Sequence, residues 1–180
     1  MLTLILGGAR SGKSRLAQRF AARAQRVCYV ATARAGEDSE MLERIERHRA
    51  DRPPSWRTAE EPLELADAIE QARRDSDVIV VDCLTIWLSN LFWEHRDGAP
   101  GGMDAFVRSQ IQRIAAAGHS SSIILVSNEV GSGTVPEAAV TRAFRDAQGL
   151  LNQWVAEVAD EVILAVAGLP MYLKKPGADQ

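Results

Sequence analysis

Short apolar runs alternate with longer segments of helical spacing along most of the chain. The clearest run is Val78-Ile79-Val80-Val81, which is continuous and therefore typical of a strand buried on both faces. The segment 62–74 instead repeats apolar residues at intervals of three and four, which predicts an amphipathic helix. The same two patterns predict strands at 2–6, 27–31, 57–59, 77–82, 122–127 and 161–166, a short edge element at 169–174, and helices at 14–24, 38–51, 62–74, 84–93, 103–117 and 137–159.

Strand and helix patterns that alternate in this way predict an α/β fold with a mainly parallel sheet and helices on both faces. Ligands of such folds bind at the carboxyl ends of the strands. That rule directs attention to four loops, which follow Leu6, Ala31, Asp82 and Ser127.

Composition narrows the class of protein further. A chain of 180 residues with 46% apolar residues is expected to form one domain, 1–180, without needing disulfides. The net charge of −3 gives no support to a nucleic-acid-binding face. Cys28 and Cys83 each lie in an apolar run and are expected to be buried thiols. No apolar run approaches the ~20 residues of a membrane span, and no signal peptide is evident, so the cytoplasm is the expected location.

The first candidate site is a glycine-rich loop between a predicted strand and a predicted helix. It fits the pattern G-x-x-x-x-G-K-[ST] in the context that this pattern requires, so it predicts a P-loop for nucleoside triphosphate. Its glycines let backbone N–H groups converge on phosphate oxygens, and the helix N-terminus favours negative charge. A chance glycine-rich turn is the alternative. The loop comprises Gly7, Gly8, Ala9, Arg10, Ser11, Gly12, Lys13 and Ser14.

Asp82 closes a predicted buried strand, as the acid of a Walker B motif does. Together with the Ser14 hydroxyl it is expected to hold Mg²⁺, directly or through water, while Lys13 reaches the β- and γ-phosphates. The alternative is that Asp82 is the N-cap of the helix predicted to begin at Leu84. A P-loop beside such an acid predicts a P-loop NTPase fold of the RecA-like type, a three-layer sandwich.

A second candidate site lies in a basic stretch. Arg44, Arg47, Arg49 and Arg52 surround His48 within nine residues. Spacing alone favours an ordinary amphipathic helix, in which His48 ends an apolar stripe and the arginines pair with nearby acids. The alternative is a phosphate-handling site, because arginines bind phosphate oxygens and a neutral imidazole is a good nucleophile toward phosphorus. His95 and His119 lack such surroundings and are expected to have surface roles.

At this point the sequence resembles a known family, the bifunctional adenosylcobinamide kinase / adenosylcobinamide-phosphate guanylyltransferases of cobalamin biosynthesis. The P-loop alone is generic, whereas the basic stretch and the block 128–131 together are specific. The resemblance runs over nearly the whole chain and rests on Gly7 to Ser14, Tyr29 to Ala33, Arg44-Ile45, His48-Arg49, Arg52-Pro53, Trp56 to Glu60, Val81 to Thr85, Ser127 to Gly131, Val135-Pro136, Phe144 to Asp146, Leu151 to Gln153 and Ala159 to Val162.

The resemblance implies two reactions. In the first, ATP or GTP phosphorylates the hydroxyl of the aminopropanol arm of adenosylcobinamide. In the second, a histidine takes GMP from GTP and passes it to adenosylcobinamide phosphate, giving adenosylcobinamide-GDP. Some relatives carry two adjacent histidines here, but this chain has Arg47 in the first position, which leaves His48 as the nucleophile.

The resemblance also implies a homotrimer with the site near subunit boundaries. Its nucleotide contacts would fall on Gly7 to Ser14 and on Ala31, Thr32, Ala33, Arg49, Ala50, Asp51, Arg52, Glu60 and Asp82. Two other functions are weighed against this one. A monofunctional small-molecule kinase would use the same P-loop without a covalent histidine intermediate. A RecA-like nucleic-acid motor would need a basic binding face, which the net charge disfavours. The roles of Glu129 and of residues 142–146 stay open between a corrinoid site and a subunit interface.

Overall fold

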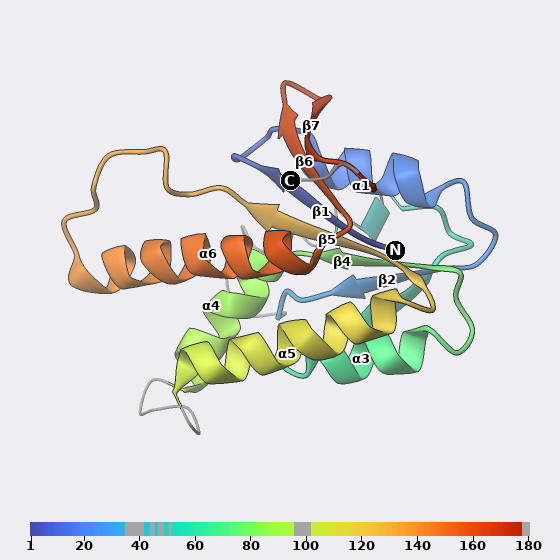
Figure 1. Ribbon diagram of the computed structural model, residues 1–180, viewed down its shortest axis with the longest axis horizontal. Helices are drawn as coiled ribbons and strands as arrows, with labels where there is room; N and C mark the ends of the chain where they lie inside the picture. The colour runs from blue at the N-terminus through green and yellow to red at the C-terminus, as the bar shows by residue number, and fades with distance from the viewer. Residues whose placement is uncertain (35–41, 44–45, 47–48, 51, 96–101, 178–180) are drawn as a thin grey trace.

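The computed structural model describes residues 1–34, 42, 43, 46, 49, 50, 52–95 and 102–177 (Figure 1). Its centre is one seven-stranded sheet in the order β3-β2-β4-β5-β1-β6-β7. All pairs of neighbouring strands are parallel except β6 and β7, which are antiparallel. The strands are β1 Leu2–Gly7, β2 Val27–Ala31, β3 Arg57–Glu60, β4 Val78–Asp82, β5 Ser122–Asn128, β6 Glu161–Val166 and β7 Leu169–Lys174.

Helices cover both faces of this sheet, which confirms the predicted α/β class with three layers. In Figure 1, α1 lies on one side of the sheet and α3, α4, α5 and α6 lie on the other. Residues 42, 43, 46, 49 and 50 are also helical, within the segment predicted as helix 38–51. The bounds of the longer helices are α1 Lys13–Ala21, α3 Leu65–Ala72, α4 Leu84–Glu94, α5 Met103–Gly118 and α6 Ala139–Val158.

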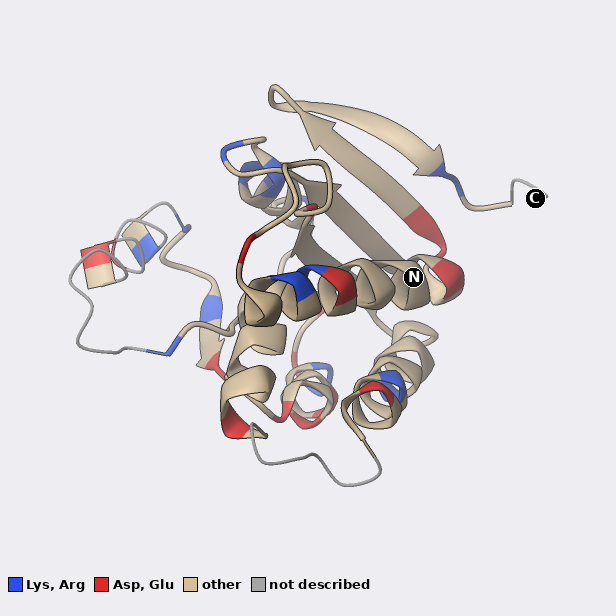
Figure 2. Ribbon diagram, turned by 90° about the vertical axis from the view of Figure 1, so that its left-hand side faces the viewer, with Lys and Arg blue, Asp and Glu red and all other residues tan. Residues whose placement is uncertain are grey.

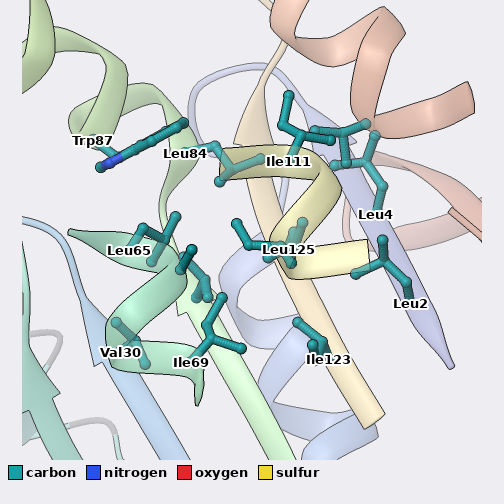
Figure 3. Close-up of a cluster of buried hydrophobic side chains, with 14 of the residues drawn as sticks. Leu2, Leu4, Val30, Leu65, Ile69, Leu84, Trp87, Ile111, Ile123 and Leu125 are labelled. Carbon is teal, nitrogen blue, oxygen red and sulfur yellow. The ribbon is translucent and has the colours of Figure 1, made fainter. Parts of the chain in front are cut away.

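Two apolar layers hold the helices against the sheet. Alternate residues of a strand point to opposite faces, so Leu4 packs toward α3–α6 whereas Ile5 packs toward α1. Because both faces are covered, the strands carry continuous apolar runs, as the pattern predicted. Figure 3 shows the larger layer, in which side chains from the strands interdigitate with those of α3, α4 and α5: Leu2, Leu4, Val30, Leu65, Ile69, Leu84, Trp87, Ile111, Ile123 and Leu125.

The predicted strands all form, and the residues predicted as an edge element form β7. Three helices are shorter than predicted: α1 ends at Ala21 rather than residue 24, α3 begins at Leu65 rather than residue 62, and α6 spans Ala139–Val158 rather than 137–159. The Glu61 carboxylate explains the second difference, because it accepts the N–H groups of Leu63 and Glu64, both at 2.9 Å, in a local turn that competes with the helix. Among the described residues no helix combines the length and apolar composition needed to cross a membrane.

Trp87 offers a test of the larger apolar layer. Its side chain is 0% exposed, and its indole N–H donates to the Leu63 carbonyl at 2.7 Å. Replacing Trp87 with Phe leaves a void and removes one of two donors to the Leu63 carbonyl, which also accepts the Leu65 N–H at 3.0 Å. We therefore expect the free energy of unfolding to fall by about 1–3 kcal/mol. The matched control is Trp93→Phe on the same helix, where the side chain is 69% exposed, with an expected change of under about 0.5 kcal/mol. Urea unfolding measures both, and equal losses would contradict this packing.

Candidate functional site

The carboxyl ends of β1 to β5 meet at one edge of the sheet. Across neighbouring strands Ala31 stands opposite both Glu60 and Asp82, and Gly7 stands opposite Asn128. The parallel register therefore gathers the four loops singled out from the sequence. Figure 2 shows acidic residues in red and basic residues in blue, and both kinds are interspersed along the ribbon in this view.

The P-loop connects β1 to α1 at this edge. Its backbone turns through two residues of positive φ, Arg10 at 58° and Gly12 at 91°. At Gly7 an added Cβ would lie 2.3 Å from the Ser11 Oγ and 2.8 Å from the Ala165 carbonyl oxygen, so this position needs a glycine. Gly12 is the N-cap of α1, which has no side-chain cap and no acid in its first turn. The helix N-terminus thus presents its amide groups and positive dipole without a local anion, which suits phosphate.

Lys13 lies against this loop. Its side chain is 8% exposed, and the ammonium Nζ donates to the Gly8 carbonyl oxygen at 3.1 Å. Ser14 follows as the second residue of α1 and is half-buried. The Ser11 hydroxyl is buried without a hydrogen-bond partner among the described residues. The lysine ammonium and the loop backbone therefore lie together, as a phosphate site requires.

Asp82 ends β4 and is held from the neighbouring strand. The Tyr29 hydroxyl of β2 donates to the Asp82 Oδ2 at 2.6 Å, a short hydrogen bond to a carboxylate. Burial raises the pKa of the Tyr29 phenol, and the Asp82 carboxylate raises it further, so the phenol keeps its proton. The N-cap of α4 is Cys83, so the alternative role of Asp82 as that N-cap is wrong.

Thr32 fixes the backbone that follows Asp82. Its hydroxyl donates to the Cys83 carbonyl at 2.8 Å and accepts the Cys83 N–H at 2.9 Å, and the side chain is 0% exposed. Because the whole residue is 0% exposed, Thr32 offers no accessible surface to a nucleotide in this arrangement, and its part here is to order the backbone beside Asp82. Both cysteines are free and buried, as predicted, and burial raises the pKa of the Cys83 thiol to about 11.

A basic hollow lies beside β3, with a volume of about 380 Å³. Arg49 forms an ion pair with Glu60, and the Arg52 Nη1 donates to the Thr58 hydroxyl at 3.4 Å. The Arg52 guanidinium carbon also lies 3.7 Å from the centre of the Tyr29 ring, a cation–π contact. The Arg52 Nε is buried without a hydrogen-bond partner among the described residues. The hollow is lined by Arg49, Arg52, Pro53, Pro54, Trp56, Thr58 and Glu60.

These contacts bring most of the predicted site residues to one edge. Ala31 and Ala33 are half-buried beside Asp82, and Ala50 is exposed and helical. His48 and Asp51 lie outside the described residues. Sequence reasoning gave no role to Tyr29, Trp56 or Thr58. A phenol within a buried, otherwise apolar strand was the available signal for Tyr29, because a buried hydroxyl needs a partner.

The loop after β5 is tied to the P-loop. The Glu129 N–H donates to the Gly7 carbonyl at 3.1 Å, and the Asn128 N–H donates to the Thr85 hydroxyl at 2.8 Å. The Glu129 carboxylate accepts the Ser132 hydroxyl and the Gly131 N–H, both at 2.7 Å. The Ser132 hydrogen bond lowers the pKa of Glu129. This loop is therefore joined to the P-loop through its main chain, while its carboxylate is held by hydrogen bonds within the loop.

The fold of this chain is also found in a solved structure. One solved structure, from a study of a prototypical ATPase of the type III secretion system of pathogenic bacteria, superimposes with a TM-score of 0.57 at 14% identity. The superposition covers 95% of this chain and 56% of that chain. At this identity the likeness concerns the fold alone, and it agrees with the predicted P-loop NTPase class.

Sequence comparison is more specific. A family model for cobinamide kinase / cobinamide phosphate guanyltransferase matches residues 3–173. The bifunctional adenosylcobalamin biosynthesis protein CobP of Pseudomonas aeruginosa is 47% identical over 175 residues, which are 97% of this chain and 98% of the relative. The CobU proteins of Escherichia coli and Salmonella typhimurium, which carry the same description, are 38% and 39% identical over 97% of this chain and 100% of each relative. This chain therefore belongs to the cobinamide kinase / cobinamide phosphate guanyltransferase family, whose members are bifunctional enzymes.

Proposed function

We propose that this chain phosphorylates adenosylcobinamide and then transfers GMP to the product, using one nucleotide site for both reactions. The observation that carries this proposal is the meeting of the P-loop, Asp82 and the basic hollow at one edge of the sheet. In the kinase step the aminopropanol hydroxyl attacks the γ-phosphorus of ATP or GTP. The bond to the β,γ-bridging oxygen breaks, and the nucleoside diphosphate leaves.

The P-loop supplies the phosphate contacts in this proposal. The Lys13 ammonium exchanges the Gly8 carbonyl, its acceptor at 3.1 Å, for the β- and γ-phosphate oxygens. The exchange is favourable because a phosphate oxygen carries more negative charge than a carbonyl oxygen. The nucleotide-binding set comprises Gly7, Gly8, Ala9, Arg10, Ser11, Gly12, Lys13, Ser14, Ala31, Thr32, Ala33, Arg49, Ala50, Asp51, Arg52, Glu60 and Asp82.

The Ser14 hydroxyl and the Asp82 carboxylate fit Mg²⁺ as the metal. No cluster of three or more acidic, histidine or cysteine side chains lies within the described chain, and a nucleotide-bound Mg²⁺ needs none. This ion keeps several waters and binds one or two protein oxygens besides the phosphates. Asp82 is already oriented by the Tyr29 hydroxyl, so its carboxylate needs little rearrangement. When bound, Mg²⁺ would neutralise charge that develops on the phosphate oxygens.

His48 is the proposed nucleophile of the second reaction. An imidazole nitrogen attacks the α-phosphorus of GTP, a P–N bond forms, and pyrophosphate leaves with the electrons of the broken P–O bond. A phosphate oxygen of adenosylcobinamide phosphate then attacks the same phosphorus and the P–N bond breaks. Arg49 and Arg52 support this role, because both line the hollow, where they contact Glu60 and Thr58, and their guanidinium groups can donate to phosphate oxygens.

We also propose that residues 1–180 act as one cytoplasmic domain and assemble as a homotrimer. Nucleoside triphosphates, the substrates of both steps, are kept in the cytoplasm. Exposed apolar side chains on the β6–β7 hairpin support an assembly, because contiguous exposed apolar residues often mark interfaces. Three of them alternate along the edge strand β7: Leu169 at 69% exposure, Met171 at 54% and Leu173 at 57%.

Gly12 provides a test of the phosphate loop. An added Cβ there would lie 2.9 Å from the Gly168 Cα, at a φ of +91°. We expect Gly12→Ala to weaken GTP binding at least about tenfold, because misdirected N–H groups lose bonds to a charged phosphate. Its unfolding free energy should fall by about 1–2 kcal/mol. The control is Gly149→Ala within α6, where an added Cβ meets nothing within 4 Å. Calorimetric titration with GTP measures both variants, and unchanged affinity in Gly12→Ala would contradict the site.

His48 is tested with GTP labelled at the α-phosphate. The wild-type protein should retain label that is acid-labile and alkali-stable, as a phosphoramidate is. His48→Ala should lose this label and keep at least about a tenth of its kinase activity, since the γ-phosphate transfer does not use the imidazole. Lys13→Ala should lose both activities.

The matched control is His119→Ala, because His119 is the C-cap of α5 and lines a hollow with Met1 and Ser122 at the opposite edge of the sheet. It should retain the label in full. Label that survives in His48→Ala would eliminate His48 as the nucleophile. Kinase activity without any label in the wild-type protein would instead favour the monofunctional kinase.

A further inference from the structure

Tyr29 is a buried polar side chain in the smaller apolar layer. It is 1% exposed and packs with Val80 and the side chains of α1 and β5. Tyr29 stands opposite Val80 in the sheet, and Asp82 lies two residues further along β4 on the same face. The tyrosine therefore reaches diagonally toward the carboxyl edge, where its hydroxyl meets the Asp82 Oδ2 at 2.6 Å.

The ring of Tyr29 has a second contact at the same edge. The Arg52 guanidinium carbon lies 3.7 Å from the ring centre, and the Arg52 Nη1 donates to Thr58, which stands opposite Tyr29 on β3. The Tyr29 hydroxyl thus hydrogen-bonds to Asp82, and the Tyr29 ring contacts Arg52, which lines the basic hollow.

We propose that Tyr29 is a positioning residue that orients the Asp82 carboxylate for the metal–nucleotide complex and holds the Arg52 guanidinium toward the same nucleotide. This inference rests on the proposed function. In this proposal the Tyr29 side chain sets the positions of Asp82, the metal-binding acid, and Arg52, a phosphate-binding arginine, relative to each other. Tyr29 touches neither phosphate nor metal and acts through the two residues that do.

Packing alone does not account for the hydroxyl. A phenylalanine would fill nearly the same volume in a layer formed by Ile5, Leu16, Val80 and Ile124 without burying a polar group. The hydroxyl instead donates its hydrogen bond to the Asp82 carboxylate at the end of the neighbouring strand. Such a charge-assisted bond restrains the side-chain rotamer of its acceptor.

Tyr29→Phe separates the two contacts because it removes the hydroxyl and keeps the ring. We expect its affinity for Mn²⁺, used as a paramagnetic probe for Mg²⁺, to fall roughly 2- to 10-fold at saturating GTP, because a carboxylate that the hydroxyl no longer restrains must be ordered when the metal binds. Affinity for GTP without metal should stay within about twofold of the wild type, because the ring still carries Arg52. Electron paramagnetic resonance of free Mn²⁺ and a metal-free GTP titration give the two values.

The matched control is Tyr172→Phe. Tyr172 is 43% exposed on β7, and the Lys175 ammonium lies 5.1 Å from its ring centre, so it also combines a phenol with a nearby cation. Both affinities should be unchanged there. Wild-type affinity for Mn²⁺ in Tyr29→Phe, or failure of this variant to fold, would overturn the proposal in favour of a structural role.

Asp82→Asn tests whether Tyr29 acts through the carboxylate. In that background Tyr29→Phe should cause no further loss of Mn²⁺ affinity, whereas two independent losses that multiply would overturn the proposal. Tyr29→Leu removes the ring as well, so the Arg52 guanidinium must be ordered when the nucleotide binds, and the metal-free GTP affinity should fall roughly 2- to 10-fold. If a folded Tyr29→Leu protein bound GTP without metal as tightly as the wild type, the proposed role of the ring in positioning Arg52 would be overturned.

The proposed function can fail separately from this inference. Absence of label from α-labelled GTP in the wild-type protein would refute the covalent step, yet the Mn²⁺ and GTP affinities would still report on Tyr29. Conversely, wild-type labelling together with a Tyr29→Phe protein of normal Mn²⁺ affinity would leave the two reactions standing and remove the positioning role.

Discussion

Burial of both faces of a parallel sheet is the constraint on which the rest of this structure depends. Strand residues such as Leu4, Ile5, Val80 and Leu125 have no access to water, so polar chemistry is confined to the points where strands end. Because the strands are parallel, those points fall together at one edge. Tyr29 is an informative exception within the strands, since its hydroxyl is buried and is satisfied by an acid at that edge.

Three charged side chains at this edge each have a local partner. Arg49 pairs with Glu60, Arg52 rests on the Tyr29 ring, and Asp82 accepts the Tyr29 hydroxyl. These pairings keep long side chains near the positions that a triphosphate would require, which lowers the entropy cost of binding it. The first turn of α1 carries no acid, so its positive end is not neutralised. The site thus favours an anionic ligand through both its side chains and its backbone.

Local signals in the sequence were sufficient for the sheet and for the phosphate loop. The strand runs and the P-loop spacing each lie within a few consecutive residues, and glycine at Gly7 and Gly12 follows directly from the geometry of that loop. The helix starting at Leu65 was misjudged because a single carboxylate, Glu61, diverts the preceding backbone into a turn. The spacing of apolar residues does not reveal that a side chain competes with the helix for backbone N–H groups.

The contacts of Tyr29 could not be predicted from the sequence, because they depend on the register of separate strands. Asp82 follows Tyr29 by 53 residues, and Arg52 belongs to yet another segment. The basic stretch was ambiguous for a related reason, since helical spacing accommodates both a solvated surface and a phosphate site. Only the family resemblance favoured the second interpretation, and the family match now supports the two activities that it implied.

We propose that one P-loop serves reactions at two different phosphates of the nucleotide. Equilibrium dialysis of the wild-type protein with GTP, repeated with ATP as competitor under conditions that prevent turnover, distinguishes one shared site from two. We expect one triphosphate bound per chain and full displacement of GTP by excess ATP. Two triphosphates per chain, or GTP that excess ATP leaves bound, would contradict this proposal.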